Sequence, residues 1–140
     1  MKNPICNCLW FDGQAKAAAT FYCSIFDNSK ITVDTPMVVN FELDGKKFMG
    51  LNGGPQFKFN EAISLVVDCE TQSEIDYYWS KLTEDGEEGQ CGWLKDKFGV
   101  SWQIVPTILG SLMTDPTKTQ RVMQAFMQMK KFDIETLKNA

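Results

Sequence analysis

The sequence predicts an α+β fold in which two paired β-α-β-β-β modules form a curved mixed sheet around a cavity, followed by C-terminal helices. Three observations predict this fold: an internal repeat, strand-rich sequence after each copy of the repeat, and an apolar stripe at helical spacing near the C-terminus. At 140 residues the chain is expected to be a single domain. Its expected parts are a first module over residues 1–54, a second module over 55–106 and a helical tail over 107–140.

The internal repeat carries the prediction of two modules. Residues 9–26 and 65–82 align without a gap at an offset of 56 residues. Each copy reads as an apolar strand, an Asp turn and a helix that closes on an aromatic pair, with the turn acid placed to cap the helix. The matched pairs are Leu9 and Leu65, Asp12 and Asp68, and Tyr22 and Tyr78. Two copies favour a duplicated module over a solenoid, which needs at least about three units.

Strand-rich sequence follows each copy of the repeat. The expected strands cover residues 30–35, 37–43 and 46–52 after the first copy, and 89–96 and 100–106 after the second. Asp44-Gly45 and residues 97–99 are the expected turns, and the second module has room for one more short strand. One helix for each group of strands predicts helices on one face of the sheet and a free face that curves around a ligand.

Within the C-terminal tail, residues 117–140 are expected to form two helices. Its apolar stripe at helical spacing comprises Val122, Met123, Phe126 and Met127. Asp133 resembles an N-cap for a short last helix whose Ile134 and Leu137 face inward. This pattern indicates packing on the domain or on a second copy of the chain.

Composition and charge argue against several classes of protein. The net charge is −4 and the closest approach to a basic cluster is Lys130-Lys131, whereas nucleic-acid binding needs clustered Lys and Arg. No apolar run approaches the ~20 residues of a membrane span, and the N-terminus lacks the apolar core of a signal peptide. We therefore expect a cytoplasmic location. The chain contains no histidine, which removes Ser-His-Asp and Cys-His catalysis.

Five cysteines, an odd number, agree with a reducing compartment. Cys6 and Cys8 alternate along the first expected strand and so share one face. We interpret them as small buried apolar residues. Thiolate metal ligands are the alternative, which lacks a second pair at the spacing of a zinc finger.

Four stretches of the chain together resemble one family: LWFDGQAKAAATFYCSIF, LNGGPQFKFNEAISLVV, CGWLKDKFGVSWQIVP and RVMQAFMQMKKFDIETLKNA. They are similar to the PhnB-like branch of the vicinal oxygen chelate superfamily, which contains glyoxalases, bleomycin-resistance proteins and dioxygenases. This branch often carries the name demethylubiquinone 3-methyltransferase. The resemblance covers nearly the whole chain, and it implies two paired modules around a cavity, usually in a homodimer.

The resemblance also implies where a metal would bind. In metal-dependent relatives the ligands, commonly His or Glu, come from the first and last strands of each module. Carried onto this chain, the four positions are Ile5, Met49, Ala62 and Gln103. An amide oxygen is a weak ligand, a thioether is a soft one, and the two aliphatic side chains offer no ligand atom. Glu61 neighbours Ala62, but strand alternation turns it to the other face. We therefore predict no metal at this site and no cofactor.

The candidate ligand site is the inner face of the sheet, which alternate strand residues line. Its predicted polar groups are Asn7, Ser64 and Gln103, and its predicted walls are Trp93 and Met49. Leu9 and Val66 belong to the same alternating set. A few fixed polar groups among apolar and aromatic walls are typical of a small-molecule site.

Three functions remain open at this point. One is binding of a small molecule without catalysis, and another is a scaffold whose own side chains fill the cavity. The remaining one is an enzyme that acts on a small organic substrate. Such an enzyme would resemble a methyltransferase, as the family name suggests, or a lyase or dioxygenase. The sequence shows no Gly-rich turn of the kind that common S-adenosylmethionine enzymes use. Acid–base chemistry would fall on Glu42, Glu61 or a cysteine, with no partner evident from spacing.

We predict a small-molecule-binding protein of the glyoxalase/bleomycin-resistance type without the usual metal site. The expected partners are an unidentified small ligand and a second copy of the chain, with no nucleic acid and no membrane. The sequence identifies no catalytic residue.

Overall fold

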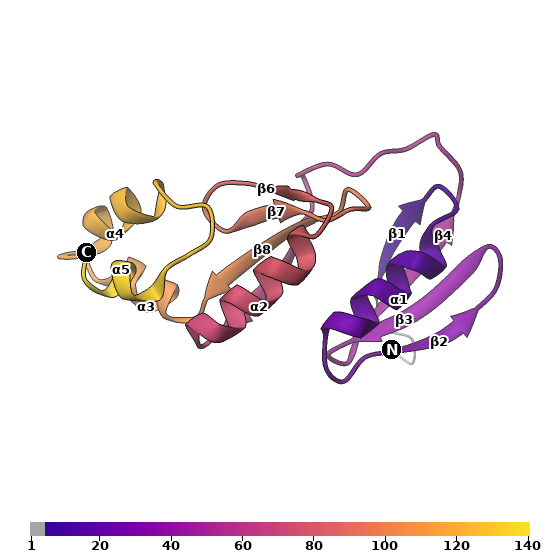
Figure 1. Ribbon diagram of the computed structural model, residues 1–140, viewed down its shortest axis with the longest axis horizontal. Coiled ribbons are helices and arrows are strands. Elements are labelled where there is room, and N and C mark those ends of the chain that lie inside the picture. Colours follow the sequence, from indigo (N-terminus) through magenta and orange to yellow (C-terminus); the bar gives the residue numbers. More distant parts are fainter. Residues whose placement is uncertain (1–4) are drawn as a thin grey trace. The chain divides into compact units, whose positions relative to one another are not determined.

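The computed structural model describes residues 5–140, and these form two compact units with the boundary between Phe59 and Asn60 (Figure 1). The elements of the first unit are β1 (Asn7–Phe11), α1 (Ala15–Ile25), β2 (Lys30–Asp34), β3 (Val38–Leu43) and β4 (Lys46–Asn52). The elements of the second unit are β5 (Leu65–Cys69), α2 (Gln72–Thr83), β6 (Glu87–Glu88), β7 (Trp93–Lys95), β8 (Ser101–Pro106), α3 (Ile108–Thr114), α4 (Thr119–Phe126) and α5 (Ile134–Lys138). Among residues 5–140, no helix combines the length and the apolar character needed to cross a membrane.

The two units repeat one topology, so the predicted α+β class and its two β-α-β-β-β modules are confirmed. The strand orders are β1-β4-β3-β2 in the first sheet and β5-β8-β7-β6 in the second. In each sheet the first strand pairs in parallel with the last strand of its module, and the other pairings are antiparallel. The expected extra strand of the second module is the two-residue β6.

The hairpin turns lie where the sequence places them. Asp44 and Gly45 connect β3 to β4 with φ angles of 50° and 77°. Positive φ at both central residues is the geometry of a two-residue turn that matches the twist of the flanking strands, and Asp-Gly adopts it readily. The Asp44-Gly45 turn therefore sets the β3–β4 register, in which Leu43 faces Lys46.

Each sheet buries one face beneath its own helix. In the first unit α1 packs on β2, β3 and β4, and the buried side chains include Ala15, Ala18, Tyr22, Val39 and Phe41. In the second unit α2 packs on β5, β7 and β8, and the buried side chains include Ile75, Leu82, Leu94, Trp102 and Ile104. Figure 1 shows α2 running alongside β8. Fully burying an aliphatic or aromatic side chain contributes about 1.5–3 kcal/mol, so these faces supply much of the stability.

The helix caps differ from the prediction that the turn acids Asp12 and Asp68 close the helices. At α1 the backbone N–H of Ala15 donates to Oδ1 of Asn52, which lies at the end of β4, over 2.9 Å. At α2 the hydroxyl of Thr71 accepts from the backbone N–H of Glu74 over 3.2 Å. The prediction was wrong because the partner of α1 comes from a distant strand and that of α2 lies three residues beyond Asp68.

The two helices predicted over residues 117–140 are present as α4 and α5, and the tail begins with one more helix. The additional helix is α3, which directly follows β8. The predicted last helix is confirmed: Asp133 accepts from the backbone N–H of Thr136 over 3.0 Å, and Ile134 and Leu137 are buried. The predicted stripe is buried only in part, since Val122 is inaccessible while Met127 is 60% exposed.

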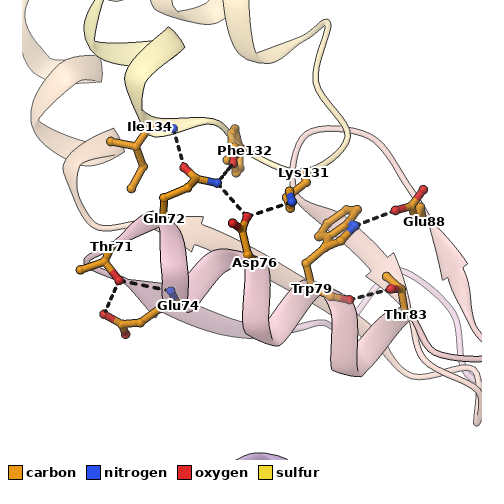
Figure 2. Close-up of polar contacts among 10 residues, drawn as sticks. All are labelled: Thr71, Gln72, Glu74, Asp76, Trp79, Thr83, Glu88, Lys131, Phe132 and Ile134. Atoms are coloured by element: carbon orange, nitrogen blue, oxygen red, sulfur yellow. Dashed lines mark hydrogen bonds and ion pairs between the residues drawn. The ribbon is translucent and has the colours of Figure 1, made fainter.

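Two sets of hydrogen bonds tie the tail to the second sheet and its helix. Nε2 of Gln72 donates to the carbonyl of Phe132 over 2.9 Å, and Oε1 of Gln72 accepts from the backbone N–H of Ile134 over 2.8 Å (Figure 2). Asp76, one turn further along α2, pairs with Lys131 over 2.9 Å. The tail is therefore held through its backbone as well as through apolar packing.

The second set of bonds depends on Gly92, which follows the tip of the β6–β7 connection. The backbone N–H groups of Cys91 and Gly92 donate to the carbonyls of Met129 and Lys130, each over 2.8 Å. Gly92 has a φ of +81°, and a Cβ there would stand 2.4 Å from the ring of Phe132. Only glycine permits this approach, because any side chain would push the tail away from the sheet.

A buried carboxylate closes the β7–β8 hairpin. Asp96 is 3% exposed. Its Oδ1 accepts from the backbone N–H groups of Phe98 and Val100 over 2.8 and 3.1 Å, and its Oδ2 accepts from Nε1 of Trp102 over 2.9 Å. A buried carboxylate is tolerated when both oxygens are satisfied in this way. The side chain thus links the turn to the strand that it begins.

Replacing Asp96 by asparagine should destabilise the protein by roughly 2 kcal/mol, because an amide NH₂ would then oppose an N–H donor in a buried site. Urea unfolding followed by tryptophan fluorescence measures this change. The exposed variant Asp12→Asn should stay within about 0.5 kcal/mol of the parent protein. Equal stabilities of Asp96→Asn and Asp12→Asn would contradict the role given to Asp96.

Replacing Gln72 by alanine should release the tail locally, because two hydrogen bonds to its backbone are lost together. Trypsin cleavage after Lys130 and Lys131 should accelerate by about tenfold, the effect of about 1.4 kcal/mol of lost local stability. Mass spectrometry of the digest locates the cuts. Gln124→Ala, at an exposed position of α4, serves as the matched control, and the idea fails if both variants are cut at the same rate.

Candidate functional site

The candidate site lies on the face of the second sheet that is turned away from α2, which we call the open face. Trp102 and Ile104 of β8 are buried toward α2, so alternation turns Ser101 and Gln103 to the opposite side, as the sequence predicts. Through the strand register, Gln103 lies between Val66 of β5 and Trp93 of β7. In the same way Ser101 pairs with Lys95, and Lys95 pairs with Glu87 of β6.

Gln103, placed in the middle of this face, satisfies a polar neighbour. Its Nε2 donates to Oγ of Ser64, just before β5, over 2.9 Å. Both side chains are half-buried. The structure therefore brings together two of the predicted site residues, and it gives the Gln103 amide a hydrogen-bonding role across the β5–β8 pair. The bond uses the NH₂ group of Gln103 and leaves the Ser64 hydroxyl hydrogen available to donate.

A pocket of about 300 Å³ is lined by residues of this face, among them Trp93, the register partner of Gln103. Its lining residues are Glu61, Glu87, Glu88, Gly89, Trp93, Leu94, Lys95 and Ser101. Trp93, predicted as a wall, lines this pocket and is half-buried. The pocket volume lies at the lower end of the range that holds small organic ligands, roughly 300–1,000 Å³.

Ser101 is the buried polar group of the pocket. Its side chain is 2% exposed, and among residues 5–140 its Oγ finds no hydrogen-bond partner. A buried hydroxyl without a partner costs roughly 1–3 kcal/mol. Such a group in a pocket wall is a candidate contact for a bound molecule.

The charged groups of the pocket form one ion pair and leave carboxylates in excess. Glu61 pairs with Lys95, and both side chains are substantially exposed. The hydrogen bond from Lys95 lowers the pKa of Glu61 below its ordinary value, and the bond to Glu61 raises the pKa of Lys95. Glu88 accepts from Nε1 of Trp79 over 2.7 Å (Figure 2). An exposed pair of this kind contributes little to stability, so its main effect is on the charge of the pocket.

The first unit separates two residues that the sequence placed on one ligand-binding face. Met49 pairs with Cys8 and shares a face with Trp10, turned away from α1. Asn7 alternates with the buried Leu9 and is the register partner of Phe48, on the side that packs under α1. Asn7 and Met49 therefore lie on opposite faces of the first sheet, and Leu9 is a core residue.

The strand register shows that the residue of the first module equivalent to Gln103 is not Met49, as the sequence suggested. Gln103 pairs with Val66, which matches Trp10 at the repeat offset, and Trp10 pairs with Leu51. The counterpart of Gln103 is thus Leu51, two residues beyond Met49. Met49 corresponds instead to Ser101.

The side chains at the implied metal positions do not fit a metal ion. Ile5 is 92% exposed and Ala62 lies in a turn before β5. Leu51 and Gln103 offer an aliphatic group and an amide that already binds Ser64. Within residues 5–140, no three His, Cys, Asp or Glu side chains gather closely enough to hold a metal.

The interpretation of Cys6 and Cys8 as buried apolar residues is wrong, because both are exposed. Partial burial, and secondarily the neighbouring Cys6, raises the pKa of the Cys8 thiol. The thiol of Cys8 is therefore protonated at neutral pH.

Several pocket residues were missed by reasoning from the sequence, namely Ser101, Lys95 and Glu87. The predicted turn at residues 97–99 contained the signal for two of them, because a β-hairpin closed there places Lys95 opposite Ser101. Glu87 lies on a strand of two residues, which is too short to produce a periodic pattern.

Comparison with solved structures shows what the fold is similar to. A PhnB protein from Bacillus cereus, provisionally described as a 3-demethylubiquinone-9 3-methyltransferase, is 35% identical over 75% of this chain and all of its own, with a TM-score of 0.69. The fosfomycin resistance protein FosX from Listeria monocytogenes is 14% identical over 80% of this chain and 96% of its own, with a TM-score of 0.59. A glyoxalase-related enzyme from Fulvimarina pelagi is 12% identical over 76% of this chain and 90% of its own, with a TM-score of 0.54. No curated protein matches the chain.

The duplicated modules and these likenesses define a protein with the glyoxalase/bleomycin-resistance, or vicinal oxygen chelate, fold. The sequence profile of one family narrows this class, since it matches residues 3–105. The chain belongs to that family, the PhnB-like 3-demethylubiquinone-9 3-methyltransferase family. The resemblance inferred from the sequence is confirmed.

Removing the charge of Lys95 should return the pKa of Glu61 toward its ordinary value of 4.5, because the hydrogen bond from Lys95 is the main cause of its lowering. Carbon-detected NMR titration of the Glu61 carboxyl in Lys95→Met measures this rise. Lys81→Met, on the exposed side of α2, should leave the Glu61 titration unchanged. An unaltered Glu61 pKa in Lys95→Met would show that the pair does not persist in solution.

Proposed function

We propose that the chain binds a small organic molecule in the pocket on the open face of the second sheet. The observation that carries this proposal is the pocket of about 300 Å³ that Trp93 lines together with Ser101, whose buried hydroxyl has no hydrogen-bond partner among residues 5–140. A flat apolar wall supplies contact area, and a fixed polar group supplies orientation. A ligand that bonds to Ser101 would also remove the cost of its unsatisfied hydroxyl.

The open face supports binding better than it supports acid–base catalysis. Gln103 is uncharged and already bonded to Ser64, and Glu61 is held by Lys95. A carboxylate whose pKa is lowered is a weak general base at neutral pH, because catalysis favours a pKa near the working pH. We therefore propose binding without a metal ion or a cofactor, in a protein that forms a homodimer as the family resemblance implies.

The family description favours a second candidate, which is transfer of a methyl group to a demethylubiquinone-like compound. The same pocket would then hold an aromatic acceptor against Trp93. This candidate requires a methyl donor as a second ligand, whereas the binding proposal requires one molecule.

A ligand screen should find small molecules that raise the unfolding temperature, and Trp93→Ala should abolish the rise because it removes the apolar wall. The screen by differential scanning fluorimetry includes S-adenosylmethionine, quinone analogues and glyoxalase-type substrates, each with and without EDTA. Phe57→Ala, an exposed aromatic outside the pocket, is the matched control.

Three results would overturn or redirect this proposal. The absence of any shift favours a scaffold, and loss of binding in EDTA contradicts the metal-free site. Methylated product, detected by mass spectrometry with S-adenosylmethionine and a demethylated quinone, would establish the second candidate. Light scattering of the purified chain tests the homodimer.

A further inference from the structure

We propose that the ligand of this pocket is a small organic cation, a protonated primary or secondary amine attached to an apolar body. The inference rests on the proposed function, because it assigns a ligand class to the same pocket. Three features carry it: the charge balance of the lining, the Trp93 ring, and the buried hydroxyl of Ser101.

The charge balance of the pocket favours a cation. Three glutamates, Glu61, Glu87 and Glu88, line it together with one lysine, Lys95. Lys95 is already paired with Glu61, so an anionic ligand would have to displace Glu61 and would then face Glu87. A cation meets the excess negative charge without breaking the existing pair. Charge complementarity of this kind contributes more to the choice between ligands than to the affinity for any one of them.

Glu87 is the carboxylate best placed to receive the cation. It is exposed and is the register partner of Lys95, so its side chain lies on the open face. Glu88, its neighbour on β6, instead accepts from Nε1 of Trp79, a residue of α2. The Glu87 side chain therefore faces the pocket, while the Glu88 carboxylate is bonded to the helix α2. Glu87 remains as the carboxylate whose charge a ligand can neutralise.

Trp93 supplies a favourable surface for the same class of ligand. An indole face attracts a cation through its quadrupole, more strongly than other aromatic side chains do. Trp93 pairs with Gln103 on β8, and the backbone N–H of Gly89 donates to the carbonyl of Trp93 over 2.9 Å. That backbone bond fixes the strand position from which the indole extends.

Ser101 distinguishes between kinds of cation. Its Oγ is buried and has no partner among the described residues, and a hydroxyl oxygen can accept a hydrogen bond from an ammonium N–H. A quaternary ammonium carries no N–H and would leave Ser101 unsatisfied. The proposal therefore predicts a preference for a primary or secondary amine over a quaternary one.

The experiment compares four probes that share one ring: benzylammonium, benzyltrimethylammonium, benzyl alcohol and benzoate. Binding to the full chain at neutral pH is followed by ¹H–¹⁵N NMR titration at low and high salt. We expect benzylammonium to bind most tightly, with an affinity that falls as salt rises because the contact with Glu87 is exposed and screened. Shifts should centre on Trp93, Lys95 and Ser101.

Variants test each contact separately. Glu87→Gln should weaken benzylammonium by roughly threefold or more, the effect of losing one exposed charge contact. Glu84→Gln, an exposed carboxylate at the end of α2 and outside the pocket, should leave it unchanged. Ser101→Ala should weaken benzylammonium while leaving benzyltrimethylammonium unaffected, since only the former donates an N–H.

The outcomes separate this inference from the proposed function. If benzyl alcohol or benzoate binds as tightly as benzylammonium, the cation class is wrong while the pocket remains a ligand site. If none of the four probes binds, the cation inference is overturned, and the broader ligand screen then decides the proposed function independently. Equal effects of Glu87→Gln and Glu84→Gln would also overturn it.

Discussion

The hydrogen bonds of the buried Asp96 carboxylate set the geometry on which the candidate site depends. Its two oxygens join the backbone of the β7–β8 turn to the indole of Trp102 on the following strand. With Trp102 held toward α2, Ser101 and Gln103 must face the other way. A slip of one residue between the strands would reverse this arrangement, because side chains alternate along a strand. The hydrogen bond between Asp96 and Trp102, on the side of the sheet that faces α2, thus determines which side chains lie on the open face.

The two modules carry different side chains on a shared framework. Both use a parallel pair between the first and last strands and a helix across one face. The first sheet presents Met49, Leu51 and Trp10 away from its helix. The equivalent surface of the second sheet presents Ser101, Gln103 and Val66. The buried pattern is common to both modules, while Met49 and Leu51 of the first module stand where the second has Ser101 and Gln103.

The sequence predicted those features of the fold that local patterns encode. The repeat offset located both helices, and Asp44-Gly45 located a hairpin because two adjacent residues can adopt positive φ. The face of β1 was not predictable, since Cys8 and Trp10 on one side are nearly as apolar as Leu9 and Phe11 on the other. The cap of α1 comes from Asn52, which is 37 residues away from Ala15, so no local motif marks it.

The candidate site was predicted in part for the same reason. Strand alternation put Ser64 and Gln103 on one face, and in the structure Gln103 donates to Ser64. Lys95 and Glu61 become neighbours only when the segment before β5 folds back on β7, which depends on the completed sheet. Charge partners separated by 34 positions leave no periodic trace in a single sequence.

The second compact unit of this chain includes the C-terminal tail, which lies beyond the residues that the family profile matches. The family profile ends at residue 105, yet Met129, Lys130 and Phe132 supply carbonyl acceptors for Cys91, Gly92 and Gln72. A chain cut after Pro106 would leave these donors unsatisfied and would uncover the side of Gly92 on which the Phe132 ring lies. Sequence change in the tail is thus coupled to the β6–β7 connection, so the two segments are expected to vary together among related chains.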